Sequence, residues 1–189
     1  MRLVLASSSP RRRELLARIG VVPDRLASPE IDEEPHPGEL PRPYVLRLAA
    51  EKAAAVDRAA DEIVLAGDTT VAVGRRILGK PDDEGDLRRM LALLSGRRHH
   101  CYSAVCVIGA DGRPRTRLSD TIVTFKRLSD REIDRYVASG EGMGKAGGYA
   151  IQGLAEAYVR YLAGSHSGVV GLPVFETRAL LEAAGYDFG

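Results

Sequence analysis

Three consecutive arginines, Arg11, Arg12 and Arg13, follow "ASSSP" at the start of a predicted helix over residues 10–19. A helix N-terminus is already partly positive, so each arginine there costs about 0.3–1 kcal/mol unless an anion is bound. On a helical wheel Arg12 lies on the apolar face, which directs it over the end of a sheet, beside free N–H groups and the hydroxyls of residues 7–9. The pattern predicts an anion site at Arg12, flanked by Arg11, with Arg13 in solvent. Solvated surface arginines are the alternative.

Two acidic residues and a lysine could complete such a site. Asp68 follows "EIVLAG", a predicted strand over residues 62–67, and α/β folds place their sites at the carboxyl ends of strands. Glu33, in an acidic loop, could supply a second oxygen ligand for magnesium, and Lys52 borders the apolar face of its predicted helix. The alternatives are a turn-forming aspartate, a solvated acidic loop and a lysine that extends to the surface.

These cations and carboxylates, with a glycine-rich loop at residues 140–153, indicate phosphoryl or nucleotidyl chemistry. Their spacing alone does not distinguish a kinase, a nucleotidyltransferase and a pyrophosphatase.

Three short motifs match known binding sequences but lack their structural context. "GRRILGKP" (74–81) has proline where a phosphate loop needs a hydroxyl, although Lys80 can reach a phosphate by another geometry. "GMGKAG" (142–147) follows a predicted helix, whereas a dinucleotide fingerprint follows a strand. "SPRR" opens an amphipathic helix, whereas minor-groove arms are tails. His99 and His100 have no carboxylate or third histidine at metal-ligand spacing, so we expect a structural or surface role.

The composition of the 189 residues is ordinary for a globular protein, with 44% hydrophobic residues and a net charge of +1. This charge argues against sequence-independent binding of nucleic acid, and no apolar stretch is long enough for a membrane span. Cys101 and Cys106 lie five residues apart in a predicted strand, so they face opposite sides and cannot form a disulfide. We expect a single domain over residues 1–189, in the cytoplasm, without a nucleic-acid or membrane partner.

Strand patterns and helix patterns interleave along the chain, which indicates an α/β layered fold. An Asp-Gly pair joins two long strand-like runs as a hairpin, so the sheet should be mixed rather than purely parallel. The predicted strands are 2–7, 62–67, a hairpin around Gly74, 99–110, 115–126 and a strand within 157–164. The predicted helices are 10–19, 43–60, 84–96, 129–140 and 173–185.

The order of eight motifs is similar to that of the Maf family: "LASSSPRRRELL", "DEE", "YVLRLAAEKA", "AGDTTV", "LGKP", "MLALLSGR", "KAGGYAIQG" and "VVGLP". The resemblance spans residues 3 to about 181. It implies hydrolysis of a nucleoside triphosphate to the monophosphate and pyrophosphate with a divalent metal, Mg²⁺ or Mn²⁺. It also implies an elongated mixed β-sheet flanked by helices, with two lobes and a central cleft as in inosine triphosphate pyrophosphatases, and a homodimer. A nucleotide-binding regulator of septum formation without essential catalysis is the alternative.

The same resemblance implies roles for individual residues. Asp68 would be the proton acceptor, and Glu33 matches a further site position; from their chemistry we expect Glu33 and Asp68 to be the metal ligands. The remaining matches to phosphate-binding and other site positions are Ser8, Arg12, Lys52 and Lys80.

The base-reading positions are similar to one branch of the family, which prefers dTTP and UTP. They are Arg11, Thr69 and Gln152, and a glutamine amide offers a donor and an acceptor to a pyrimidine edge. The chain departs from the commoner family pattern at Gly67, Thr70 and Gly144. A broader triphosphate specificity is therefore the alternative to a narrow preference for dTTP and UTP.

Overall fold

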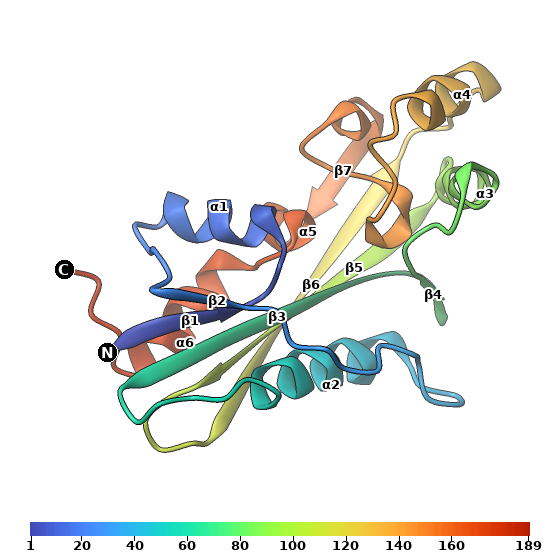
Figure 1. Ribbon diagram of the computed structural model, residues 1–189. Coiled ribbons are helices and arrows are strands. Elements are labelled where there is room, and N and C mark those ends of the chain that lie inside the picture. Colours follow the sequence, from blue (N-terminus) through green and yellow to red (C-terminus); the bar gives the residue numbers. More distant parts are fainter.

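One seven-stranded sheet with helices on both faces forms the computed structural model, which describes residues 1–189 (Figure 1). The strands are β1 (Arg2–Ala6), β2 (Arg25–Ala27), β3 (Glu62–Val73), β4 (Arg76–Leu78), β5 (Arg98–Ile108), β6 (Pro114–Phe125) and β7 (Val159–Ala163). The α-helices are α1 (Pro10–Arg18), α2 (Pro41–Ala54), α3 (Glu84–Leu94), α4 (Asp130–Ala138), α5 (His166–Val170) and α6 (Val174–Ala183). Two short 3₁₀ turns, η1 (Ala146–Gly148) and η2 (Leu154–Tyr158), lie before β7.

The strand order is β2-β1-β3-β5-β6-β7, with β4 paired to the end of β3. β1 runs parallel to β2 and β3, and the remaining pairs are antiparallel. The predicted α/β fold with an elongated mixed sheet is therefore confirmed. None of the helices combines the length and apolar character that a membrane span requires.

Alternation along the strands builds a hydrophobic core on each face of the sheet. Leu3 and Leu5 of β1 belong to the larger core, which α1, α3, α4 and α6 cover. Val4 and Ala6 belong to the smaller core, which α2 covers. Figure 1 shows α2 alone on its side of the long central strands. The packing of α2 on this side of the sheet therefore determines which face of β3 its lysine, Lys52, can reach.

The helix predicted at 43–60 begins and ends earlier, as α2 over Pro41–Ala54. Prolines fit in the first turn because N–H groups there have no partner within the helix. After α2 ends, Ala59 lies outside the helix, and its N–H donates a 3.0 Å hydrogen bond to the carboxylate of Glu62. The short elements β2 and α5 were not predicted, because three and five residues carry too little periodicity.

The strand predicted to end before Asp68 continues to Val73, so the expected position of Asp68 at a strand end is wrong. β5 pairs with β3 without interruption from Val64 to Ala72 and holds the chain extended through Asp68. The hairpin around Gly74 is confirmed, with φ of 59° at this glycine.

Cys101 and Cys106 are both buried and belong to the cores on opposite faces, as predicted. His99 is fully buried and its Nε2 lies 2.9 Å from the hydroxyl of Tyr149. Its ring packs edge-on against Phe125 and Tyr149. Burial lowers the pKa of His99 to about 4, so this side chain is neutral and structural at pH 7.

This buried histidine predicts a loss of stability in acid. The unfolded chain takes up a proton near pH 6.5 and the folded chain only near pH 4, so the free energy of unfolding falls as the pH drops through this interval. The difference of about 2.5 pKa units corresponds to about 3 kcal/mol. Urea unfolding at pH 7 and pH 4.5 should show most of this loss, about 2.4 kcal/mol, in the wild type and a much smaller one in His99→Asn. Equal losses in both proteins would contradict it.

Candidate active site

A cavity of about 450 Å³ lies where β3 changes its partner. β1 pairs with β3 as far as Ala66, and β4 begins to pair only at Val71, so residues 67–70 have no neighbouring strand on that edge. Successive side chains of a strand point to opposite faces. The gap therefore exposes Asp68 from one face of β3 and Thr69 from the other to the same cavity.

All nine predicted site residues line this cavity: Ser8, Arg11, Arg12, Glu33, Lys52, Asp68, Thr69, Lys80 and Gln152. They come from the start of α1, the acidic loop, α2, β3, the segment after β4 and the glycine-rich loop. Three of the four lysines of the chain are among the lining residues, together with two arginines. Such a concentration of positive charge in a cavity suits a polyanionic ligand.

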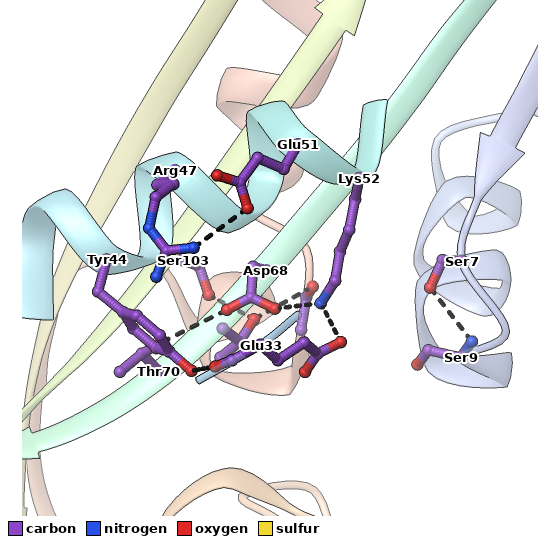
Figure 2. A network of polar contacts seen from close by, with 12 residues as sticks. Ser7, Ser9, Glu33, Tyr44, Arg47, Glu51, Lys52, Asp68, Thr70 and Ser103 are labelled. Carbon is purple, nitrogen blue, oxygen red and sulfur yellow. Dashed lines mark hydrogen bonds and ion pairs between the residues drawn. The ribbon is translucent and has the colours of Figure 1, made fainter. Parts of the chain in front are cut away.

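Lys52 bridges the two carboxylates of the cavity, as Figure 2 shows. Its Nζ lies 2.7 Å from Asp68 Oδ1 and 2.8 Å from Glu33 Oε1. The side chains of Lys52 and Asp68 are about 10% exposed (11% and 9%), and that of Glu33 is 45% exposed. Lys52 is thus held inward by carboxylates and does not extend to the surface.

The charges around Glu33 keep it ionised. Burial alone would raise the pKa of its carboxyl, but the hydrogen bond and charge of Lys52, with the charges of Lys80 and Arg12, lower the pKa below its ordinary value. The Tyr44 hydroxyl donates a 2.8 Å hydrogen bond to the backbone oxygen of Glu33 and holds the acidic loop in place (Figure 2). This contact of Tyr44 was not predicted, because its periodicity indicates only a position on α2.

Arg12 lies at the opposite side of the cavity from α2. Its Nη1 donates to Ser7 Oγ at 3.1 Å and its Nε to the backbone oxygen of Gly171 at 2.9 Å. Burial lowers the pKa of the guanidinium, and the charge of Asp68 opposes that effect. The predicted placement over the sheet, beside a serine hydroxyl, is confirmed. No carboxylate forms an ion pair with this half-buried cation, which leaves its charge available to an anion.

The other basic groups of the cavity are less confined. Lys80 Nζ lies 4.0 Å from Glu33 Oε2 and its side chain is largely exposed. Arg11 Nε donates to the backbone oxygen of Val170 at 3.4 Å. Lys145 also lines the cavity and was not predicted; burial lowers its pKa, and the neighbouring Arg11 lowers it further. Lys145 is the first residue of the motif "KAGGYAIQG", and from the sequence alone it is one more residue of the glycine-rich loop.

The glycine-rich loop is packed against β3 and forms the wall that carries Gln152. Gly147 has a φ of 70° and its N–H donates to the backbone oxygen of Gly79 at 2.9 Å. A Cβ at this glycine would lie 2.7 Å from a methyl group of Val71, closer than atoms pack. Only glycine therefore allows the loop to approach the strand closely enough to close this side of the cavity.

Glu33 and Asp68 fit a divalent metal that is shared with a substrate. One oxygen of each carboxylate contacts Lys52, and the second oxygen does not. The second oxygen of Asp68, Oδ2, has the Thr70 hydroxyl as its partner at 3.4 Å. No group of three or more His, Cys, Asp or Glu side chains is arranged to hold a metal alone. Mg²⁺ is commonly bound by one or two carboxylates together with substrate phosphates, and this donor set matches that pattern.

The family model for Maf-like proteins matches residues 2–184. The chain is 74% identical to a protein of Sphingopyxis alaskensis named dTTP/UTP pyrophosphatase, over 99% of this chain and 98% of the relative. A protein of Novosphingobium aromaticivorans with the same name is 61% identical, over 98% and 92%. The structure of a nucleoside-triphosphatase, dITP/XTP pyrophosphatase, from Mycobacterium abscessus has a TM-score of 0.44 and 20% identity, over 68% of this chain and 76% of that one. From the family model and these sequence identities, the chain belongs to the Maf family.

Proposed function

We propose that the protein is a nucleoside triphosphate pyrophosphatase that hydrolyses dTTP, UTP and modified pyrimidine triphosphates to the monophosphate and pyrophosphate. The observation that carries this proposal is the Glu33–Lys52–Asp68 bridge, which faces the arginines and lysines of one cavity. The names of the family relatives agree with it.

In this proposal Asp68 is the general base. Its carboxylate accepts a proton from a water molecule as the water oxygen forms a bond to the α-phosphorus. The bond from that phosphorus to the α–β bridging oxygen breaks, and pyrophosphate leaves with the bonding electrons. Lys52 orients the carboxylate through its 2.7 Å contact with Oδ1.

The cations of the cavity bind the triphosphate and stabilise the charge that develops on the leaving pyrophosphate. Arg12 is fixed by Ser7 and Gly171, so it meets the anion without reorganisation. Lys80 is exposed and can follow the outer phosphates. Ser8 lines the same end of the cavity and would donate its hydroxyl.

We assign Glu33 and Asp68 as the protein ligands of a divalent cation, Mg²⁺ or Mn²⁺, which supplies further positive charge to the phosphates when it is bound. The base would lie against Arg11, Thr69 and Gln152, at the end of the cavity that the glycine-rich loop closes. Family membership supports two further expectations, a homodimer and a location in the cytoplasm.

The proposal predicts pyrophosphate release from pyrimidine triphosphates in the presence of Mg²⁺ or Mn²⁺. The protein is incubated with dTTP, UTP, their 5-substituted forms, CTP and GTP, and the products are separated by chromatography. This experiment measures both the activity and the breadth of substrate specificity. Comparable rates on every triphosphate would favour the broader specificity. No pyrophosphate from any substrate would contradict the enzyme, and nucleotide binding without turnover would favour a regulator.

A further inference from the structure

Thr69 lines the cavity, and its hydroxyl contacts two other protein atoms. Its Oγ1 lies 2.9 Å from Ser103 Oγ, on the neighbouring strand β5, and 3.4 Å from the backbone oxygen of Gly171. Ser103 is 1% exposed and is not among the residues that line the cavity. Ser103 can therefore affect a ligand only through the groups it contacts, which are the Thr69 hydroxyl and the Gly168 carbonyl.

The hydrogen atoms of this group can be placed by counting. Ser103 Oγ lies 2.5 Å from the backbone oxygen of Gly168, which can only accept, so the single hydroxyl hydrogen of Ser103 is used there. The hydrogen between Thr69 and Ser103 must then come from Thr69. If the Thr69 hydroxyl turns to Gly171 instead, its hydrogen still goes to a protein atom. A ligand that reaches the Thr69 hydroxyl therefore meets lone pairs and no hydrogen.

The Gly168 carbonyl cannot easily move away from Ser103. The Gly168 N–H donates to Ser165 Oγ at 2.9 Å, and the Ser165 N–H donates to Thr121 Oγ1 at 2.9 Å on β6. Gly168 is buried, and a Cβ there would lie 3.2 Å from Ser165. The acceptor that takes up the Ser103 hydrogen is thus anchored on two sides.

We infer that Ser103 is a positioning residue that fixes the Thr69 hydroxyl as a hydrogen-bond acceptor, and that this acceptor selects bases carrying an N3–H group. Uracil and thymine carry that donor, whereas N3 of cytosine is an acceptor and would face the lone pairs of Thr69. This inference rests on the proposed function and names the feature of the base that the site distinguishes. A buried polar pair that cannot form its hydrogen bond lowers affinity by about 10- to 100-fold.

The test compares kcat/KM for UTP and CTP in four proteins: the wild type, Ser103→Ala, Thr69→Val and the double variant. Ser103→Ala removes the 2.9 Å partner and leaves the Thr69 hydroxyl only its longer 3.4 Å contact with Gly171, which a hydrogen bond to cytosine can replace. The kcat/KM for CTP should then rise about tenfold and the UTP/CTP ratio should fall. Thr69→Val should also lower the ratio. Adding Ser103→Ala to Thr69→Val should change the ratio no further, because the positioned group is already gone.

Ser119→Ala is the matched control, because Ser119 is a buried serine opposite Ser103 on β6 and lies close to Gly168. Its UTP/CTP ratio should equal that of the wild type. An unchanged ratio in Ser103→Ala, or an equal effect of Ser103→Ala with and without the Thr69 hydroxyl, would overturn the inference. If Ser103→Ala does not fold, Thr69→Ser should keep the wild-type UTP/CTP ratio and Thr69→Val should lower it. Equal ratios in Thr69→Ser and Thr69→Val would overturn the inference.

The two proposals fail in different ways. Wild-type protein that releases no pyrophosphate from UTP contradicts the proposed function. Wild-type protein that hydrolyses UTP and CTP with equal kcat/KM leaves the pyrophosphatase intact and overturns the role of Thr69 and Ser103.

Discussion

Replacing Asp68 with asparagine lowers kcat for UTP about 100- to 10,000-fold in our account, because an amide cannot accept the proton of the attacking water. The side chain keeps its size, and its amide oxygen can still accept the hydrogen bond that Lys52 now donates at 2.7 Å. The fold and the affinity for the triphosphate should therefore change much less than the rate. Steady-state kinetics, circular dichroism and nucleotide binding by calorimetry measure these three quantities separately.

Asp120→Asn provides the matched control for this variant. Asp120 is an aspartate on β6 whose Oδ1 lies 2.7 Å from His100, outside the cavity. Its replacement should leave kcat within about twofold of the wild type, since surface ion pairs contribute little. A kcat for Asp68→Asn close to that of the wild type would show that Asp68 is not the general base.

Replacing Lys52 with methionine should impair both the rate and the stability. Methionine keeps much of the length of the side chain but removes the cation between Asp68 and Glu33, so the two carboxylates keep only the more distant charges of Arg12 and Lys80. Loss of one partner from a buried ion pair typically costs 3–5 kcal/mol, and we expect about 3 kcal/mol because Glu33 reaches solvent. The rate should fall at least about 100-fold, because Asp68 loses its orientation and the phosphates lose a cation.

Lys126→Met is the control, because Lys126 pairs with Glu132 at 2.6 Å on the surface. This change should cost less than about 1 kcal/mol and leave activity intact. Thermal and urea unfolding of both variants, with kcat/KM for UTP, would test the comparison. Equal losses of stability and of kcat/KM in Lys52→Met and Lys126→Met would contradict the role of the Lys52 ion pairs.

Much of the site could be predicted because its residues carry local signals. Arg12 is misplaced for a helix start and lies on the apolar face of α1, so its direction follows from helix geometry. Lys52 borders the apolar face of α2, and the structure places it inward as expected. The position of Asp68 within its strand could not be predicted, because the length of β3 is set by its pairing with β5.

Other parts depend on contacts between distant segments and leave no local pattern. Ser103 meets Gly168 only after β5 and α5 are packed together, and its sequence context is that of an ordinary strand residue. Lys145 follows a glycine in a loop whose course is set by the approach of Gly147 to Val71. The gap between β1 and β4 that opens the cavity is likewise a property of the assembled sheet.

The central claim is that water attacks the α-phosphorus of a nucleoside triphosphate at Asp68. Hydrolysis of UTP by the wild-type protein in H₂¹⁸O, followed by mass spectrometry of both products, tests this claim most directly. The account predicts one ¹⁸O atom in UMP and none in pyrophosphate. Label in pyrophosphate, or UDP and orthophosphate as products, would contradict it.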